Sequence, residues 1–256
     1  MKRINRCVRA GTVLAVALAF GACDDATGPE TLDDAVVLDM AVLAADATLE
    51  DVAMWGQPLG FGGLPAAVPG RPGGHGDFSG EFSGTRAVTF FDEDGNEQDA
   101  FNRLTTESVH LIREIAGHIA RDNFSADIAR ARDMTVSGLA GEETHRTWNG
   151  SGTEEVSRTG VLEDGTERSH SMSGAFEYDD VVVPVPGSDP RYPVSGTITR
   201  SMTATLTRPD RTVTRSVEIV ITFDGTAIAT AIVNGEAMEI DLAARAGRNP
   251  LRRRGK

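Results

Sequence analysis

Residues 194–223, VSGTITRSMTATLTRPDRTVTRSVEIVITF, contain the alternation that decides the fold. Every second residue is mostly apolar, and threonine or serine fills most positions between. Because successive side chains of a strand point to opposite faces, each half reads as a strand with one apolar face. Pairing the halves across the Pro209-Asp210 loop places these residues opposite each other: Leu206 and Val213, Met202 and Val217, Ile198 and Ile221. This antiparallel register keeps both apolar rows on one face.

Turn dipeptides continue this hairpin pattern along the chain: Asp94-Gly95, Asp164-Gly165, Asp224-Gly225 and Asn234-Gly235. Asp-Gly and Asn-Gly supply the positive φ angles that tight hairpin turns need. Through Asp224-Gly225, we expect Ile228 opposite Ile221 and Ile232 opposite Val217. A three-residue loop over 233–235 with a bulge then keeps Met238 on the same face.

Residues 107–121 fit two patterns. Val109, Ile112, Ala116 and Ile119 have helical spacing, whereas Val109, Leu111, Ile115 and Ile119 have strand spacing. The β-branched content and Gly117 favour a strand. The fold class is therefore mainly β. We expect a single antiparallel β-meander of some eight to ten strands, either a curved sheet or an up-and-down barrel, after a short acidic helical segment and a Gly/Pro-rich linker.

The chain begins with a tripartite pattern. Residues 1–12 carry Lys2, Arg3, Arg6 and Arg9, residues 13–20 are apolar, and Gly21-Ala22 precede Cys23. Such a pattern is typical of a secretory signal. The apolar run would rise about 12 Å as a helix, well short of the roughly 30 Å hydrocarbon core of a bilayer.

Phe20-Gly21-Ala22-Cys23 resembles the lipobox of bacterial lipoproteins, with Phe20 where that family usually has leucine. The resemblance covers about the first 30 residues. It implies cleavage before Cys23, acylation of Cys23, and a lipid anchor in the bacterial cell envelope, on the periplasmic side or at the cell surface. Cys7 lies in the removed segment, so the mature chain would hold Cys23 alone and form no internal disulfide.

Four regions follow from these patterns: a signal peptide over 1–22, a tether over 23–80, a β domain over 81–244 and a basic tail over 245–256. In the tether, Thr31 and Thr48 each precede an acid by three residues, as at helix starts. The expected apolar stripe of this helix is Leu32, Val36, Leu43, Leu49 and Val52. The chain has 38 acidic and 25 basic residues, a net charge of −13 that argues against nucleic acid as a partner.

Arginines fall on the apolar parity of the predicted strands: Arg113, Arg130, Arg132, Arg158, Arg168, Arg200 and Arg215. An apolar face that carries guanidinium groups suits an amphiphilic anion such as an anionic lipid or glycolipid. Two structural explanations stand beside this one. The arginines lie near strand ends with their heads in water, or the acidic helix covers this face and pairs with them through Asp33, Asp39, Asp46 or Glu50.

No catalytic or metal-binding pattern emerges. Residues 91–99, FDEDGNEQD, resemble part of a calcium loop, but Arg103 occupies the position of the bidentate glutamate, which favours a hairpin turn. The histidines show no ligand spacing, and Ser169, His170 and Ser171 lack a nucleophile elbow.

We therefore expect a protein without enzymatic activity, metal or cofactor, and hence an envelope lipoprotein that binds a lipid-like anion. The alternative is a structural or interaction lipoprotein with an envelope protein as partner. The basic tail is either a ligand for anionic head groups or a solvated end.

Overall fold

The computed structural model describes residues 32–55, 79–121, 124–161, 167–209, 211–244 and 250–253. The predicted signal peptide, Cys23, the linker over 56–78, the turn at Asp164-Gly165 and most of the basic tail lie outside these residues. Among the described residues, no helix has the length and apolar composition needed to cross a bilayer.

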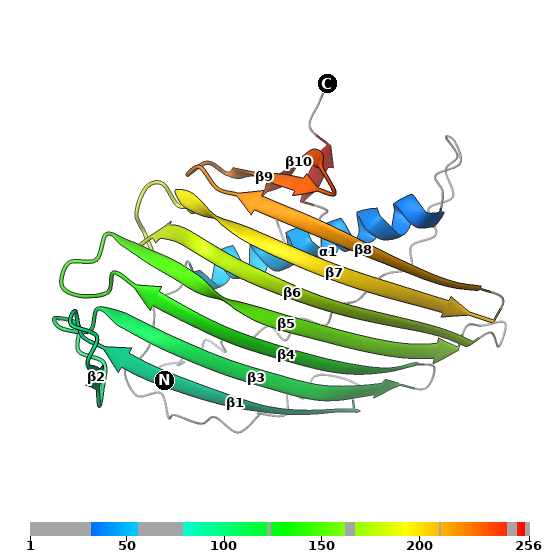
Figure 1. Cartoon of the computed structure of the whole chain (residues 1–256), viewed down its shortest axis with the longest axis horizontal. Coiled ribbons are helices and arrows are strands. Elements are labelled where there is room, and N and C mark those ends of the chain that lie inside the picture. Colours follow the sequence, from blue (N-terminus) through cyan, green and yellow to red (C-terminus); the bar gives the residue numbers. More distant parts are fainter. Residues whose placement is uncertain are drawn as a thin grey trace, which may run out of the picture.

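The described chain forms one helix and one antiparallel sheet of eleven strands (Figure 1). The helix is α1 (Leu32–Trp55). The strands are β1 (Ser79–Phe91), β2 (Glu97–Gln98), β3 (Ser108–Arg121), β4 (Phe124–Ser137), β5 (His145–Val161), β6 (Glu167–Pro184), β7 (Ser195–Arg208), β8 (Arg211–Thr222), β9 (Ile228–Val233), β10 (Glu236–Asp241) and β11 (Leu251–Arg253).

The sheet is an open meander, in the order β11-β10-β9-β8-β7-β6-β5-β4-β3-β1-β2. The predicted fold class is thus confirmed as a curved sheet and not a closed barrel. Residues 108–121 form a strand, because β3 pairs along its whole length with β1 on one side and β4 on the other. The predicted register of β7 and β8 is also confirmed: Leu206 faces Val213, Met202 faces Val217, and Ile198 faces Ile221.

The predicted register of β9 is wrong. Ile221 pairs with Ala231, and Val220 pairs with Ile232. A five-residue connection over 223–227 separates the strands, and in it Asp224 accepts hydrogen bonds from the amide and hydroxyl of Thr226 at 3.0 and 2.7 Å. The longer loop reverses the parity of β9. Its inward residues are Ala229, Ala231 and Val233, whereas Ile228 and Ile232 are each 37% exposed.

The predicted bulged loop before β10 is wrong for the same reason. Asn234 and Gly235 form a two-residue turn with φ angles of 47° and 89°, and Val233 pairs directly with Glu236. With β9 reversed, this tight turn brings Met238 opposite Ala231 on the buried face. At the far edge, part of the predicted basic tail forms β11, in which Leu251 pairs with Ile240.

Helix α1 lies across one face of the sheet, behind β6–β8 in Figure 1. We call this the inner face and the opposite one the outer face. The helix buries a different stripe from the predicted one: Met40, Ala41, Ala44, Ala45, Thr48, Asp51 and Trp55. Leu43, Leu49 and Val52 are only half-buried. Small residues let the helix approach the sheet closely, and the Thr48 hydroxyl donates to the Ala44 carbonyl at 2.8 Å. Thr48 is therefore inside the helix and not at a second helix start.

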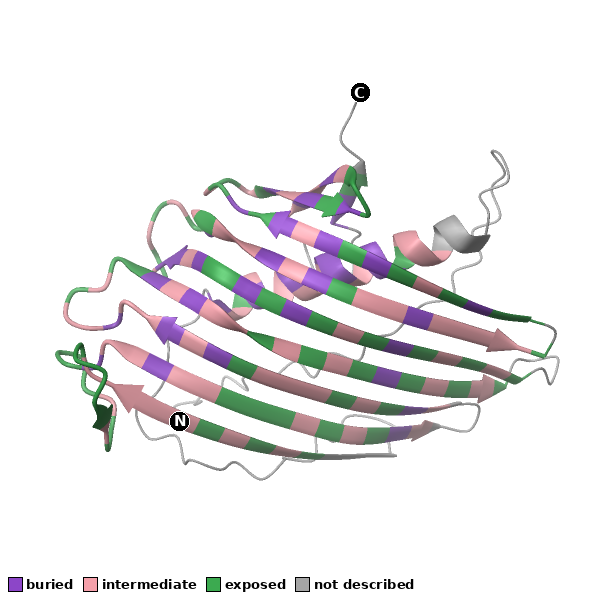
Figure 2. Cartoon of the chain, in the orientation of Figure 1, coloured by how far each residue is buried: buried purple, intermediate pink, exposed green. Residues whose placement is uncertain are grey.

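Burial is uneven across the sheet. Buried residues gather on β5–β9 near α1, whereas most of β1 and β3 is half-buried or exposed (Figure 2). An aromatic cluster lies at the C-terminal end of α1. There the Trp55 ring packs edge-on against the rings of Tyr178 and Phe223, with ring centroids 5.4 and 6.2 Å apart. The helix is thus part of the hydrophobic core of the sheet.

Candidate functional site

The strand register gathers arginines into one row on the inner face. Arg86 on β1 pairs with Arg113 on β3, and Arg113 pairs with Arg132 on β4. We call Arg86, Arg113 and Arg132 the arginine row. Directly opposed residues share a face, so all three guanidinium groups belong to the side on which α1 lies. Across the sheet, the same register continues through Gly152 and Phe176 to Arg200 on β7.

Helix α1 supplies a negative charge to two of these arginines, Arg132 and Arg200. The Asp51 carboxylate has no exposed surface; its Oδ2 accepts from Arg200, and its Oδ1 lies 3.5 Å from Arg132 Nη1. The acidic helix therefore covers the arginine-bearing face, as one structural explanation predicts, but through Asp51 and not through Asp39, Asp46 or Glu50. The side chain of Asp33 lies outside the described residues. The pattern of the sequence did not predict that Asp51 pairs with these arginines, because Thr48 and Asp51 together resemble a helix start.

Phe176 separates the two arginines that Asp51 bridges. Its ring centroid lies 5.5 Å from Arg132 Cζ and 5.3 Å from Arg200 Cζ, distances that allow cation–π attraction on both sides. Gly152 leaves room for the ring, since a Cβ there would lie 2.4 Å from Phe176 Cζ. Nearby, burial and the Asp51 carboxylate raise the pKa of the Tyr178 hydroxyl above its ordinary 10.0. This end of the row is a packed and paired part of the core.

The other predicted arginines are also engaged. Arg130 binds Glu154 on β5 at 2.7 Å, and both side chains are half-buried. Arg215 donates to the Thr214 carbonyl at 2.7 Å, and Arg158 and Arg168 make further interactions of their own. Arg158 lies near His170, whose pKa is lowered by burial and by Arg158, while Asp39 on α1 opposes the shift. The structure therefore spreads the seven predicted arginines over the inner face and does not gather them in one pocket.

The opposite end of the arginine row differs. Arg86 is half-buried and Arg113 is exposed, and neither has a carboxylate partner among the residues that the structure describes. Arg113 as a whole residue is exposed, but partial desolvation of its guanidinium group lowers the pKa of this side chain, and the positive charges of Arg132, Arg86 and Arg130 lower it further. Arg86 was missing from the predicted set. The signal for it was available, because it lies on the same parity of its strand as Val88 and Phe90.

Apolar side chains flank these two guanidinium groups. Val88 and Leu111 oppose each other on one side of the row, and Ile115 lies two residues beyond Arg113 on the other side. All three are half-buried. We call Arg86, Val88, Leu111, Arg113 and Ile115 the uncovered patch. It combines exposed positive charge with apolar surface, on strands other than β7, β8 and β11, where α1 makes most of its contacts.

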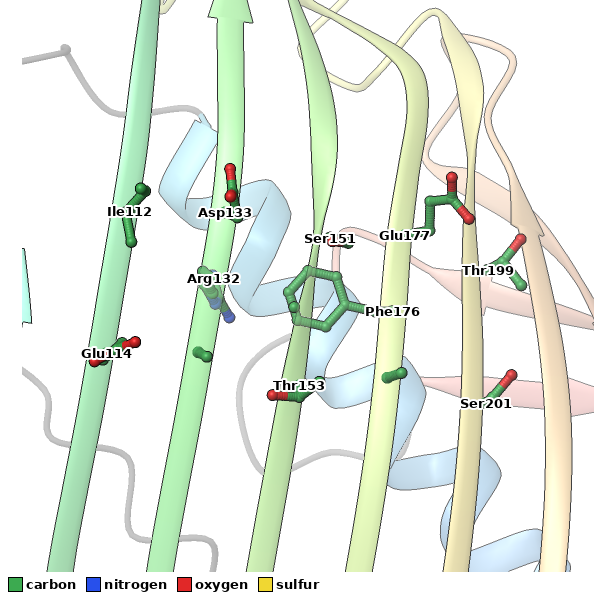
Figure 3. A pocket seen from close by; sticks show the side chains of 13 residues that line it. Ile112, Glu114, Arg132, Asp133, Ser151, Thr153, Phe176, Glu177, Thr199 and Ser201 are labelled. Carbon is green, nitrogen blue, oxygen red and sulfur yellow. The ribbon is translucent and has the colours of Figure 1, made fainter. Parts of the chain in front are cut away.

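The outer face has the opposite character. A shallow depression of about 460 Å³ is lined by small residues of several strands, by Ile112 and Phe176, by the acids Glu114, Asp133 and Glu177, and by Arg132 (Figure 3). A second, of about 810 Å³, includes His118, which contacts Asp127 at 2.7 Å. No group of three or more metal-ligating side chains occurs in the described part of the chain. Both depressions are open, and acidic side chains outnumber basic ones in each: Glu114, Asp133 and Glu177 against Arg132 in the first, and Asp127 and Glu155 beside His118 in the second. They therefore suit an anion less well than the arginine row does.

The structure also places two weaker candidates from the sequence, the calcium-loop-like turn at Asp92 and the segment 169–171. The Asp92 carboxylate accepts hydrogen bonds from the amides of Asp94 and Asn96 at 3.1 and 2.8 Å, so it serves its own turn, and these bonds lower its pKa. Strand alternation points His170 toward Arg158 and the helix, and Ser169 and Ser171 to the outer face. These three residues therefore form no nucleophile–base pair.

Comparison with known proteins returns no matching family model, no matching curated protein and no matching solved structure.

Proposed function

We propose that this chain is an exported, non-enzymatic bacterial envelope lipoprotein, held to the membrane by lipid on Cys23, that binds an amphiphilic anion at the uncovered patch. The observation that carries the binding proposal is the pair Arg86 and Arg113. They lie directly opposite each other, flanked by apolar side chains, and neither pairs with an acid in the described structure. Like charges directly opposed across strands are destabilising. A bound anion relieves that repulsion, and its apolar part covers Val88, Leu111 and Ile115.

The anchor has its own test. Intact-mass measurement on protein extracted from native membranes should give a chain that begins at Cys23 and carries the mass of acyl groups. Cys23→Ser should leave the membrane fraction, because more than one acyl chain is needed for stable anchoring. An uncleaved chain, or a free Cys23 thiol, contradicts this part of the proposal.

The binding site is tested separately. Protein purified without added lipid should yield a bound amphiphile on extraction and mass spectrometry. Arg86→Gln and Arg113→Gln should lose it. Arg103→Gln and Arg191→Gln, which remove the same charge from exposed loop positions, should keep it. If wild-type protein carries no amphiphile and takes up none when incubated with oleate or lysophosphatidate, the binding proposal fails.

A second function is favoured by one edge of the sheet. Residues 79–89 of β1 pair with β3, but in the described structure only Phe90 and Phe91 pair with β2 on the other side. An unpaired edge of this length is a template for another strand. A protein partner that adds a strand here would cross-link to β1, and Val88→Pro would abolish the cross-link while Arg113→Gln would leave it intact.

A further inference from the structure

The uncovered patch belongs to a larger cluster of charges whose balance indicates which anion it takes. Five arginines take part: Arg86, Arg113, Arg130, Arg132 and Arg200. Three acids face them: Glu50 and Asp51 from α1, and Glu154 from β5. With every group charged, the cluster has an excess of two positive charges. Arg86 and Arg113, which have no acidic partner among the described residues, place this excess at the end of the row beyond α1.

We propose that the uncovered patch selects an amphiphile with a phosphate monoester head group over one with a single carboxylate. This inference rests on the proposed binding function. A phosphate monoester carries about −1.5 to −2 charges at pH 7, which matches the excess, whereas a carboxylate neutralises half of it. A fatty acid would therefore leave one guanidinium group uncompensated.

The geometry of the row favours the same head group. Arg86 and Arg113 are on neighbouring strands, which lie about 4.8 Å apart, so one small anion reaches both guanidinium groups. A phosphate monoester offers three terminal oxygens, enough for one bidentate contact and a further hydrogen bond. A carboxylate offers only two oxygens and one negative charge, so a bidentate contact with one guanidinium leaves it fewer acceptor positions and no further charge for the second.

Arg132 gives the site a third donor. It is only 26% exposed, and Asp51 Oδ1, 3.5 Å from its Nη1, accepts no hydrogen bond. Arg132 is thus held loosely by Asp51, which Arg200 binds more closely. The apolar residues Val88 and Leu111 beside the row distinguish a lipid from inorganic phosphate, because only a lipid buries them.

The experiment uses the mature chain with Cys23→Ser and two ligands that share one oleoyl chain, 1-oleoyl lysophosphatidate and oleate. Calorimetric titration below the micellar concentration should show lysophosphatidate binding at least about tenfold tighter, because its head group makes at least one more charge-assisted hydrogen bond than the carboxylate. Inorganic phosphate, as a third probe, should bind more weakly than lysophosphatidate. Lowering the pH from 7 to 5 should reduce the preference, because the second phosphate pKa is about 6.

Arg113→Gln and Arg86→Gln should each lower the affinity for lysophosphatidate to near the affinity for oleate. Arg103→Gln should retain it, and far-UV circular dichroism checks that each variant folds. Equal, Arg113-dependent affinities for the two lipids would overturn the head-group inference and leave the proposed function standing. Inorganic phosphate binding as tightly as lysophosphatidate would make this a phosphate site, and binding unaffected by Arg113→Gln would place the site elsewhere. Absence of binding to either lipid would refute both proposals.

Discussion

Asp51 is fully buried, yet it faces two guanidinium groups, those of Arg132 and Arg200, from the last turns of α1. Burying a carboxylate is costly unless a counter-charge and hydrogen bonds compensate it. Here the counter-charges come from β4 and β7, which are 81 and 149 residues away along the chain. The pair therefore specifies where the helix docks, while the aromatic and alanine contacts around it supply the apolar burial.

Asp51→Asn should lower the free energy of unfolding by about 3–5 kcal/mol, because it leaves the buried Arg200 guanidinium without its counter-charge. Urea denaturation measures this change. Asp46→Asn is the matched control: Asp46 is on the same helix, is half-buried and has a pKa raised by burial, so its loss should not destabilise the protein. Equal effects of the two variants would mean that the ion pair has no special role.

Gly152→Ala should destabilise the protein by about 1–3 kcal/mol through overpacking, because the new methyl group would lie 2.4 Å from Phe176 Cζ and 2.5 Å from the Ala131 carbonyl oxygen. Gly174→Ala tests the same change on the next strand, where the nearest atoms are 3.5 Å away, and should change stability little. Thermal unfolding of the two variants separates the steric effect from a general effect of removing a strand glycine.

At the level of the element, α1 carries three acids that the sheet partly buries. Burial raises the pKa of Asp39, Asp46 and Glu50; His170 opposes the shift of Asp39, and Arg130 opposes that of Glu50. A raised folded-state pKa means that the fold favours the protonated acid. The stability that these groups contribute is complete below their ordinary values of 3.8 and 4.5, and it is lost as the pH rises through the raised values.

The variant Asp39→Asn, Asp46→Asn, Glu50→Gln should therefore gain stability relative to wild type as the pH rises from 4 to 7. Denaturant unfolding at several pH values measures the difference. Asp92→Asn gives the opposite sign, because the hydrogen bonds from Asn96 lower the Asp92 pKa, so the stability from this carboxylate is lost as the pH falls through the lowered value. A pH-independent difference for the triple variant would show that the helix acids are not desolvated.

At the level of the whole molecule, helix and sheet share one core. Trp55 on α1 and Trp148 on β5 are the two tryptophans of the chain; both are buried, and their ring centroids are 6.1 Å apart. A helix that only tethers the sheet would not bury its terminal tryptophan among Trp148, Tyr178 and Phe223. The arrangement makes α1 one of the two layers that every stable domain needs.

Helix and sheet should consequently unfold together. In Trp148→Phe, the fluorescence of Trp55 reports on the helix, and in Trp55→Phe, that of Trp148 reports on the sheet. Within each variant, the midpoint from fluorescence should coincide with the midpoint from far-UV circular dichroism, as two-state unfolding requires. An earlier transition of Trp55 alone would show that the helix detaches before the sheet unfolds.

The local pattern predicts part of the fold and part of the site. Alternation in 194–223 predicts the register of β7 and β8, because a register shift by one residue would place their two apolar rows on opposite faces of the sheet. The pattern in β9 is ambiguous, because Ile228, Thr230 and Ile232 form one face and Ala229, Ala231 and Val233 the other, and either set can face inward. The length of the loop over 223–227 decides, and Thr226 sets that length by binding Asp224.

The sequence by itself determined a mainly β meander and an inner face that carries both apolar and arginine side chains, because strand periodicity assigns each residue to a face. Only the tertiary structure decided which of those arginines have partners. Asp51 reaches Arg132 and Arg200 because α1 crosses the sheet there, whereas Arg86 and Arg113 lie beyond the helix. Periodicity is a local property, but the pairing of charges depends on contacts between elements far apart in the chain.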